Sequence, residues 1–383
     1  MQLSNCLNIA DLREAARRRL PRGVFDYLDK GTEDQVALQE NRDAFERRKL
    51  LNRVMVPLKG RELGTVLFGK PIGLPLVIAP TGLAGLCWFE GEMAVARSAA
   101  AAKIPFTLAT GATTAMERIV GESGAECWFQ VYMWADRAKS FQLVKRARSA
   151  GFRSLVVTVD FALGANREHN KRNGFITPFK LNPKAARDVA LHPRWLLSVL
   201  GRHVVKYGAM PRNENFPDDY RATILKNPME RDVIRNETME WEDLRRLRDV
   251  WPETLIVKGI IRPDDAERAV EYGADGIVVS NHGGRNMDSA CASLDALPAV
   301  VKAVGGGTTI MLDSGIRRGS DLVKALALGA QAVMVGRAPL YGVAAGGQAG
   351  SDLALKLLRT EFEKTMAYVG CRTVGEIGED VLA

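Results

Sequence analysis

Eight short apolar runs recur along the chain, and each one ends abruptly at a polar residue or a glycine. They lack the alternation of polar and apolar residues that marks a half-exposed strand, which is typical of parallel strands buried on both faces. The runs are Leu74–Ala79, Ile104–Leu108, Cys127–Tyr132, Ser154–Thr158, Leu255–Lys258, Gly276–Ser280, Thr309–Asp313 and Ala332–Gly336.

The segments between these runs carry apolar residues three and four positions apart, which predicts helices. Strand and helix therefore alternate, and right-handed crossovers would close the strands into a (β/α)8 TIM barrel of the α/β class. An open doubly wound sheet is the alternative, but it would need an early GxGxxG turn, and none follows a predicted strand. The predicted helices are Gly91–Lys103, Ala138–Ser149, Trp241–Val250, Pro263–Tyr272, Leu294–Val304 and Gly319–Leu328.

Two parts of the chain fall outside this repeat. Residues 1–73 are expected to form a helical extension before the first barrel strand, and residues 174–238 form a long insertion after the fourth strand. Barrels of this kind routinely exceed 250 residues as one domain, so we expect residues 1–383 to be a single domain. The insertion follows the carboxyl end of a strand, which is the face where barrel enzymes work.

The composition, with 46% hydrophobic and 26% charged residues, is that of a soluble protein with a substantial core. Five scattered cysteines without paired spacing indicate a reducing, cytoplasmic setting and no metal site. No apolar stretch is long enough to span a bilayer. The net charge of +8 leaves nucleic acid, an anionic lipid surface or acidic small molecules open as partners. Because no nucleic-acid-binding motif is present, we expect no nucleic acid.

Polar residues cluster where the predicted strands end, which is where a barrel places its active site. The two turns after the last two strands, residues 313–319 and 335–337, combine glycines with arginines and predict a phosphate site, although ordinary glycine turns with solvated arginines are the alternative. The strand-end residues are Pro80, Thr81, Gly82, Ala109, Thr110, Gln130, Tyr132, Thr158, Asp160, Lys258, Ser280, His282, Arg285, Asp313, Arg317, Gly336 and Arg337.

Among the four histidines, only His282 directly follows a predicted strand. It lies between Asn281 and two glycines, which leave room for a ligand. An imidazole suits general-base chemistry near neutral pH. Asp160, at the end of another strand, has two possible roles: it orients this histidine, or it caps a helix.

At these positions the sequence resembles the FMN-dependent 2-hydroxy acid oxidases and dehydrogenases, over almost the whole chain. The overall pattern is most similar to mandelate dehydrogenase and bacterial membrane lactate dehydrogenases. The resemblance is carried by the motifs at Tyr27–Gly31, Ile78–Gly82, Trp128–Tyr132, Val157–Asp160, Val257–Gly259, Ser280–Arg285 and Leu312–Gly319.

The resemblance implies an enzyme that oxidises an L-2-hydroxy acid to its 2-oxo acid. Electrons would pass from reduced FMN to a quinone-type acceptor, with lactate as substrate or O2 as acceptor being the alternatives and a related FMN-barrel isomerase less favoured. The chain is then expected to form a homo-oligomer, a tetramer. The implied catalytic residues are His282 as base, Asp160 as its partner, Arg285 and Arg167 near the substrate carboxylate, and Tyr27 and Tyr132 as hydrogen-bond donors.

The same resemblance implies a set of FMN contacts. Lysine beside the flavin ring would supply a compact positive charge that stabilises the anionic reduced form. The implied contacts are Pro80, Thr81 and Gly82 with the ring, Gln130, Thr158 and Ser280 with its polar edge, Lys258 with N1 and the C2 carbonyl, Asp313 with the ribityl chain, and Gly315, Arg317, Gly336 and Arg337 at the phosphate.

Some positions depart from the family pattern. Gly111 stands where glycolate oxidase-like members carry a bulky aromatic residue, so we expect an aromatic substrate such as mandelate, unless neighbouring loops fill the space. Gly82 stands where oxidases often have alanine, which favours a quinone-type acceptor over O2. Ala109, Asn286 and the pair Phe161-Ala162 also differ, which affects local contacts only.

Residues 177–212 of the insertion are strongly basic, with Asp188 as their single acid. An apolar stretch, Trp195–Leu200, lies among the cations. This combination predicts a segment that attaches peripherally to anionic lipid, and it resembles the membrane-attaching segment of mandelate dehydrogenase. We therefore expect the protein at the cytoplasmic face of the inner membrane; an active-site lid or an oligomer contact is the alternative. The cations are Lys180, Lys184, Arg187, Arg194, Arg202, Lys206 and Arg212.

Overall fold

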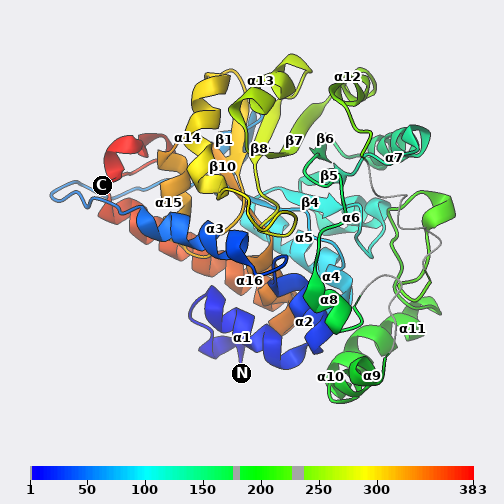
Figure 1. Ribbon diagram of the computed structural model, residues 1–383. Helices are drawn as coiled ribbons and strands as arrows, with labels where there is room; N and C mark the ends of the chain where they lie inside the picture. The colour runs from blue at the N-terminus through cyan, green and yellow to red at the C-terminus, as the bar shows by residue number, and fades with distance from the viewer. Residues whose placement is uncertain (1, 176–181, 227–236) are drawn as a thin grey trace.

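Eight parallel strands close into a barrel in which the last strand pairs with the first (Figure 1). The computed structural model describes residues 2–175, 182–226 and 237–383. Each predicted apolar run overlaps one barrel strand, so the predicted (β/α)8 barrel is confirmed. In the order of the chain the strands are β3 (Leu76–Ile78), β4 (Phe106–Ala109), β5 (Cys127–Val131), β6 (Ser154–Thr158), β7 (Thr254–Ile260), β8 (Gly276–Val279), β9 (Thr309–Leu312) and β10 (Ala332–Val335).

The strand register brings the polar strand ends to one edge of the barrel. Ala109 of β4 lies opposite Gln130 of β5, and Thr158 of β6 lies opposite Lys258 of β7. Because all eight strands are parallel, every carboxyl end opens on the same side. Residues far apart in the sequence therefore meet there.

Helices cover the outside of the barrel, and all six predicted helices are present within two residues of their predicted ends. Helices α4 and α6 follow β3 and β4 and were not predicted. The helices after the first barrel strand and outside the insertion are α4 (Ala84–Cys87), α5 (Gly91–Ala102), α6 (Met116–Ser123), α7 (Arg137–Ala150), α12 (Trp241–Val250), α13 (Pro263–Glu271), α14 (Ser293–Val304), α15 (Gly319–Ala327) and α16 (Arg337–Tyr368). Helix α16 consists of two helices that meet at a kink at Gly346 and Gly347.

The strands separate two hydrophobic cores. Alternate strand residues such as Val77, Val156 and Val278 point into the barrel and pack there with Trp128 and Met311. The strand residues between them face outward and pack against the surrounding helices. This explains why the runs show no polar alternation, because both faces of each strand are buried.

A short antiparallel hairpin accompanies the helices of the extension and was not predicted. Strands β1 (Thr65–Leu67) and β2 (Lys70–Ile72) pair with each other, and Phe68 and Gly69 at the turn have φ of +47° and +73°. Two successive positive φ values are typical of a tight hairpin turn. Leu67 and Ile72 pack with the inner barrel core, so the hairpin contributes to that core.

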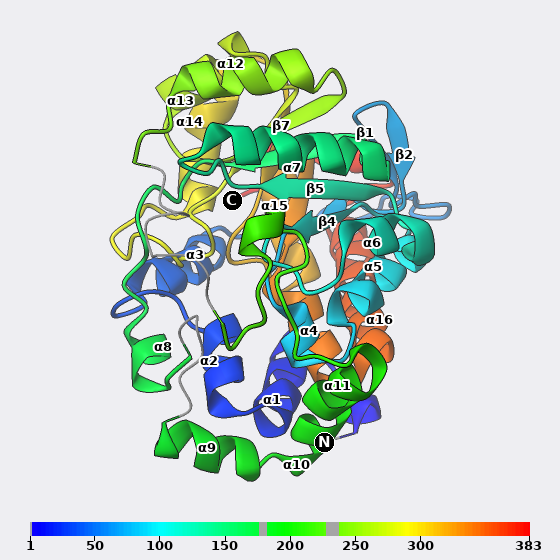
Figure 2. The same cartoon turned by 90° about the vertical axis from the view of Figure 1, so that its right-hand side faces the viewer.

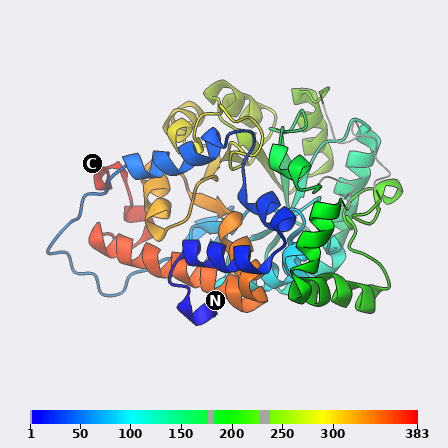
Figure 3. The ribbon, with the colours of Figure 1, turned by 60° about the horizontal axis from the view of Figure 1, so that its bottom comes forward.

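The first helices of the chain pack against the barrel helices. Helix α1 (Ile9–Arg19) lies along α16, as Figure 3 shows. Helix α2 (Arg22–Asp29) contacts α8 (Glu168–Arg172), and α3 (Val36–Arg47) contacts α14. The extension therefore reaches the side of the molecule that holds the strand ends.

The insertion folds into short helices at one edge of the molecule (Figure 2). These are α9 (Pro183–Ala190), α10 (Pro193–Trp195) and α11 (Arg202–Tyr207), with a π-helical stretch over Leu196–Gly201, and α8 lies just before the insertion. The predicted basic segment begins at residue 177, and its residues 177–181, including Lys180, lie outside the described residues. Within the described part of the chain, no helix is long and apolar enough to cross a bilayer.

The packing of Trp195 corrects one expectation about the insertion. Its side chain is only 4% exposed, and its Nε1–H donates to the backbone oxygen of Leu86 at 2.7 Å. Val199, one turn further, is buried as well. The sequence pattern did not reveal that this face of the apolar stretch packs against the barrel and so is not available to lipid.

Four short segments of the described chain form single 3-10 turns. They lie at both ends of the chain and in the insertion. They span Leu3–Asn5, Asp218–Tyr220, Val374–Glu376 and Glu379–Val381, the last two forming the C-terminal segment.

Candidate active site

A cavity opens at the carboxyl ends of the barrel strands, and nearly all of the predicted site residues line it. Asp160 and Ser280 are the exceptions, because they lie behind the lining residues His282 and Lys258. The predicted residues that line the cavity are Tyr27, Pro80, Thr81, Gly82, Gly111, Gln130, Tyr132, Thr158, Arg167, Lys258, His282, Arg285, Asp313, Gly315, Arg317, Gly336 and Arg337.

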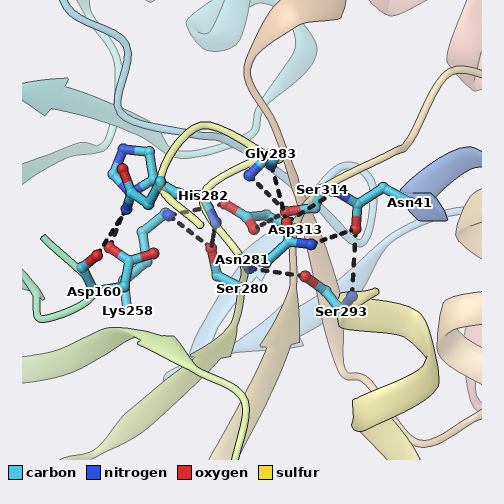
Figure 4. Close-up of polar contacts among 12 residues, drawn as sticks. Asn41, Asp160, Lys258, Ser280, Asn281, His282, Gly283, Ser293, Asp313 and Ser314 are labelled. Atoms are coloured by element: carbon cyan, nitrogen blue, oxygen red, sulfur yellow. Dashed lines mark hydrogen bonds and ion pairs between the residues drawn. The ribbon is translucent and has the colours of Figure 1, made fainter. Parts of the chain in front are cut away.

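His282 and Asp160 form a partly buried pair on the cavity wall (Figure 4). The Nδ1 atom of the imidazole lies 2.9 Å from Oδ1 of Asp160. Burial lowers the pKa of His282 below the ordinary value for histidine, although the carboxylate opposes this shift. The ring is therefore neutral near pH 7, with Nδ1–H donated to Asp160 and Nε2 left as a proton acceptor.

Asp160 remains ionised in this setting. Burial alone would raise its pKa, but the nearby charges of His282 and Lys258 and the hydrogen bond from His282 lower it overall. The amide of Asn286 also donates to the backbone oxygen of Asp160 at 2.8 Å. A fixed carboxylate is thus available to stabilise a positive charge on the imidazole.

Lys258 is a second buried charge with fixed partners. Its Nζ lies 3.0 Å from Oδ2 of Asp313 and donates to Oγ of Ser280 at 2.9 Å. Burial would lower the pKa of Lys258, but the carboxylates of Asp313 and Asp160 raise it overall, so the ammonium stays charged. Ser280 also accepts the backbone N–H of His282 at 3.0 Å. The predicted flavin contacts of Ser280 and Asp313 stay predictions, since both side chains already interact with the ammonium group of Lys258.

Four arginines at the cavity lack a carboxylate partner among the described residues. Arg285 donates to the backbone oxygens of Tyr27 and Lys30, and Arg167 donates to that of Arg285. Arg317 and Arg337 likewise bond only to backbone oxygens.

The charge on two of these arginines, the partly buried Arg285 and Arg337, is costly to the fold. Burial lowers the pKa of Arg285 to about 9 and that of Arg337 to about 10, and neighbouring arginines contribute in both cases. Buried cations without acidic partners are unfavourable unless an anion completes the site. The cavity is therefore built to hold negatively charged groups.

Some buried polar atoms of the cavity-lining residues have no hydrogen-bond partner within the described part of the chain. They include Nε2 of Gln130 and Oγ1 of Thr158. The amide orientation of Gln130 is fixed because its Oε1 accepts the backbone N–H of Thr110 at 3.2 Å. An unpaired buried donor costs free energy unless a ligand satisfies it. These atoms fit the polar edge of a flavin ring, as the sequence predicted for both residues.

Glycines hold the chain close together at the arginine-rich end of the cavity. A Cβ atom at Gly315, which has a φ of +88°, would lie 2.4 Å from the backbone oxygen of Asn41. A Cβ at Gly336 would lie 3.2 Å from Cγ2 of Thr81. Glycine backbone beside Arg317 and Arg337 suits a phosphate group, which agrees with the phosphate site predicted from these two turns.

Aromatic residues form the other end of the cavity. Tyr27 and Tyr132 point their rings at neighbouring aromatics, with Tyr27 5.3 Å from Phe175 and Tyr132 5.5 Å from Phe161 between ring centroids. Burial raises the pKa of Tyr132, so its hydroxyl remains a donor. Gly111 lies beside Gly82, and a Cβ there would meet only the Cα of Gly82, at 3.9 Å. Open space therefore remains beside Gly111.

Sequence reasoning missed several lining residues. Phe161 follows Asp160 directly and was noted only as a departure from a family pattern, while Trp134 comes two residues after Tyr132. Their places at strand ends were the available signal. Phe216, which contacts Trp134 at 5.1 Å, comes from the insertion and gave no periodic signal.

Comparison with known proteins agrees with this geometry. The family model for FMN-dependent dehydrogenases matches residues 16–383. An (S)-mandelate dehydrogenase from Pseudomonas putida is 38% identical over 99% of this chain and 94% of its own length. An L-lactate oxidase from a Nostoc species is 40% identical over 99% of both chains.

A solved structure is also similar over its full length. The crystal structure of a monotopic membrane protein, (S)-mandelate dehydrogenase, superimposes with a TM-score of 0.91 at 37% identity, and the match covers 99% of each chain. Since family, full-length relatives and fold agree, the resemblance predicted from the motifs is confirmed. The chain belongs to the FMN-dependent dehydrogenase family and is an enzyme that oxidises 2-hydroxy acids with FMN.

Proposed function

We propose that the enzyme oxidises L-2-hydroxy acids to 2-oxo acids with His282 as the general base. The observation that carries this proposal is the pairing of a neutral His282 with an ionised Asp160, next to partly buried arginines that have no acidic partner among the described residues. The pair supplies a proton acceptor, and the arginines supply a carboxylate site. A 2-hydroxy acid presents both groups that such a site needs.

His282 takes a proton from the substrate at Nε2. Its Nδ1–H remains donated to Asp160, so the imidazolium that forms lies against a carboxylate at 2.9 Å. This carboxylate keeps the ring in one tautomer and stabilises its positive charge, which is how a buried aspartate supports a histidine base. Asp160 therefore acts through His282.

Arg285 and Arg167 orient the substrate through its carboxylate. A guanidinium presents a planar fork that binds both carboxylate oxygens at once and fixes their direction. Tyr27 and Tyr132 add hydroxyl donors from the same wall of the cavity. Binding at these points places the hydroxyl-bearing carbon of the substrate beside His282.

FMN would be held by the remaining lining residues of the cavity. The residues that suit its ring are Pro80–Gly82, Gln130, Thr158 and Lys258. The neighbouring Ser280 and Asp313 are predicted contacts of the polar edge of the ring and of the ribityl chain. The residues that suit its phosphate are Gly315, Arg317, Gly336 and Arg337. Bound FMN supplies the acceptor for the two electrons of the oxidation. Lys258 contributes a fixed positive charge, which favours an electron-rich ring.

Steady-state assays of the holoenzyme test this proposal. Lactate, glycolate and mandelate are each offered with a quinone analogue and, separately, with O2. We expect turnover of the L enantiomers, and faster turnover with the quinone analogue than with O2. Turnover that requires a nicotinamide, or none with any 2-hydroxy acid, contradicts the proposal.

We further propose that the preferred substrate carries an aromatic or similarly bulky group. The open space beside Gly111 and the aromatic rings of Phe161 and Tyr132 support this preference. The relative named as a mandelate dehydrogenase is 38% identical over 94% of its own length. An aromatic substituent would bury apolar area against these rings, whereas the methyl group of lactate would leave part of the space empty.

Replacing Gly111 by tryptophan is expected to shift preference from mandelate towards lactate and glycolate. The indole would occupy the space that receives the phenyl group. We expect the ratio of kcat/KM for mandelate to that for lactate to fall at least about tenfold, the scale on which apolar pockets discriminate. Gly121→Trp, on the exposed surface of α6, is the matched control. A wild-type enzyme that prefers glycolate, or an unchanged ratio in Gly111→Trp, contradicts the preference.

We also propose that the insertion attaches the enzyme peripherally to anionic membranes at the cytoplasmic face, where a quinone acceptor would be within reach. Leu191, Leu197 and Val205 are 68%, 70% and 89% exposed. Lys184 and Arg194 are exposed and form no ion pair among the described residues. Apolar side chains flanked by free cations suit the boundary between acyl chains and headgroups. We also propose that the enzyme forms a homotetramer, as the resemblance implies.

Co-sedimentation with vesicles that contain anionic lipid tests this attachment. The wild type is expected to bind at low salt and to be released as salt rises, because each cation near the surface contributes on the order of 1 kcal/mol and is screened. The triple variant Leu191→Ser, Leu197→Ser and Val205→Ser should lose binding and keep its turnover of soluble substrates.

The matched control for this variant replaces three equally exposed apolar residues elsewhere. These are Val54, Met55 and Val66, which are 71%, 98% and 62% exposed. Their replacement by serine should leave vesicle binding unchanged. A wild type that stays in solution at low salt, or equal binding by both triple variants, means that the insertion does not attach to lipid.

A further inference from the structure

The loop that carries His282 has an unusual backbone conformation. His282, Gly283 and Gly284 have φ values of +59°, +69° and +68°. Glycine adopts this left-handed region readily, whereas a residue with a side chain, histidine included, adopts it uncommonly and at a cost that the surrounding structure must offset. The position of the imidazole therefore depends on what holds this loop.

Side-chain oxygens capture four successive backbone N–H groups of the loop (Figure 4). This arrangement replaces the regular hydrogen bonds that a helix or strand would supply. The bonds run from Asn281 N to Ser293 Oγ at 2.9 Å, from His282 N to Ser280 Oγ at 3.0 Å, from Gly283 N to Ser314 Oγ at 2.9 Å, and from Gly284 N to Asn281 Oδ1 at 3.1 Å.

Asn281 is in turn held by Asn41 of helix α3. The two amides exchange hydrogen bonds in both directions, each at 2.9 Å. Both side chains are buried, and Asn281 also donates to the backbone oxygen of Cys291 at 3.1 Å, which fixes the orientation of its amide. Asn41 Oδ1 is also 3.4 Å from the backbone N–H of Ser293. One residue of α3 thus contacts both residues whose side chains hold the start of the loop: the side chain of Asn281 and the backbone N–H of Ser293.

The chain before α3 closes on the same loop. The backbone N–H of Thr32 donates to the oxygen of Gly284 at 3.0 Å, and a Cβ at Gly284 would lie 2.5 Å from the backbone nitrogen of Leu38. Asp288, which follows the loop, accepts the backbone N–H of Asp34 at 3.0 Å. The N-terminal extension therefore packs directly on the catalytic loop.

We infer that Asn41 is a positioning residue for His282, acting through Asn281 from outside the barrel. This inference rests on the proposed role of His282 as the base. Neither Asn41 nor Asn281 lines the cavity. Only an amide at position 41 both donates to Asn281 Oδ1 and accepts from its Nδ2 in a buried place, so the loss of that amide leaves Asn281 unsatisfied and the loop free to relax.

Asn41→Leu tests the inference, because leucine has a similar shape and cannot form hydrogen bonds. We expect FMN content and KM for the hydroxy acid to stay near those of the wild type, since the arginines and the flavin-facing residues are untouched. We expect kcat to fall roughly tenfold or more, because displacement of a catalytic group by about 1 Å costs up to ~10²-fold. Gln39→Leu, exposed on the same helix, is the matched control.

A second readout does not depend on turnover. The chain has four histidines, so NMR can follow each imidazole separately. In Asn41→Leu the ring signals of His282 should shift or broaden, whereas those of His169, His192 and His203 should stay in place. A general loss of stability would instead affect all four signals and lower FMN content.

The outcomes separate the two hypotheses. Unchanged kcat and unchanged His282 signals in Asn41→Leu overturn the positioning role, even if the wild type oxidises 2-hydroxy acids. If the wild type shows no such activity, or His282→Ala keeps it, the proposed function fails, and the NMR comparison still decides whether Asn41 fixes the ring. Should Asn41→Leu fail to fold, Asn41→Ser, which removes the reciprocal amide pair with a smaller side chain, is judged by the same two readouts.

Discussion

Replacing His282 by alanine is expected to lower kcat by a factor of roughly 10² to 10⁴, the usual cost of losing a general base. KM for the hydroxy acid should change far less, because Arg285 and Arg167, the proposed carboxylate site, are untouched. The physical reason for the loss of kcat is that Nε2 of His282 is the proposed proton acceptor, with Asp160 2.9 Å from its Nδ1 to stabilise the resulting charge. Steady-state kinetics of the FMN-loaded variant measure both quantities.

The control for this variant is His203→Ala, in the insertion. That histidine interacts with the backbone oxygen of Ala209 and the rings of Phe89 and Tyr207, away from the cavity lining. The His203→Ala variant should turn over substrate like the wild type. Near-normal kcat in His282→Ala, with FMN content unchanged, would rule out the assigned base.

Replacing Arg285 by methionine is expected to reduce kcat/KM by about 30-fold to several thousand-fold. Removing one partner of a buried charge pair costs ~2–5 kcal/mol, and ~1.4 kcal/mol corresponds to a factor of ten. Arg285→Lys should fall between methionine and the wild type, because lysine keeps the charge and loses the planar fork. Steady-state kinetics with the preferred hydroxy acid give these values.

Arg262→Met serves as the surface control for Arg285. Arg262 pairs with Asp264 at the exposed start of α13 and does not line the cavity. FMN content is measured in parallel, because Arg285 also bonds the backbone oxygens of Tyr27 and Lys30. If Arg285→Met and Arg262→Met have the same kcat/KM as the wild type, the carboxylate site lies elsewhere.

The barrel was predictable because burial on both faces leaves a simple mark in the sequence. Runs such as Ser154–Thr158 are apolar up to the residue where the strand opens into the cavity, and the structure places this strand at the same bounds. The hairpin of β1 and β2 left no such mark, because each strand has only three residues and its turn uses Phe68, a residue with no turn preference.

Most of the site could be predicted because parallel strands bring their carboxyl ends together. This rule collects Gln130, Lys258 and Asp313 without knowledge of contacts. Asn41 escaped prediction, because a residue outside the barrel repeat reaches the catalytic loop only through tertiary packing. The hydrogen bonds of Ser280 and Asp313 to Lys258 were likewise invisible in the sequence, which indicates a residue's strand but not its partner.

The insertion shows the limit of composition as a guide. The excess of cations in the insertion can be counted in the sequence. The burial of Trp195 cannot, because it depends on a contact with Leu86, which lies far away in the chain. A helix presents one face to the barrel and another to solvent. In short irregular helices such as α10, the spacing of apolar residues is too brief to show which face is buried. The exposed residues Leu191, Leu197 and Val205 could be chosen only from the structure.

The most direct test of the central claim is an anaerobic titration of the purified holoenzyme, followed by the visible absorption of its flavin. One equivalent of an L-2-hydroxy acid should bleach the flavin, the D enantiomer should not, and His282→Ala should bleach far more slowly with the same flavin content. An absorption spectrum that no L-2-hydroxy acid changes, or equal bleaching by both enantiomers, would contradict the account.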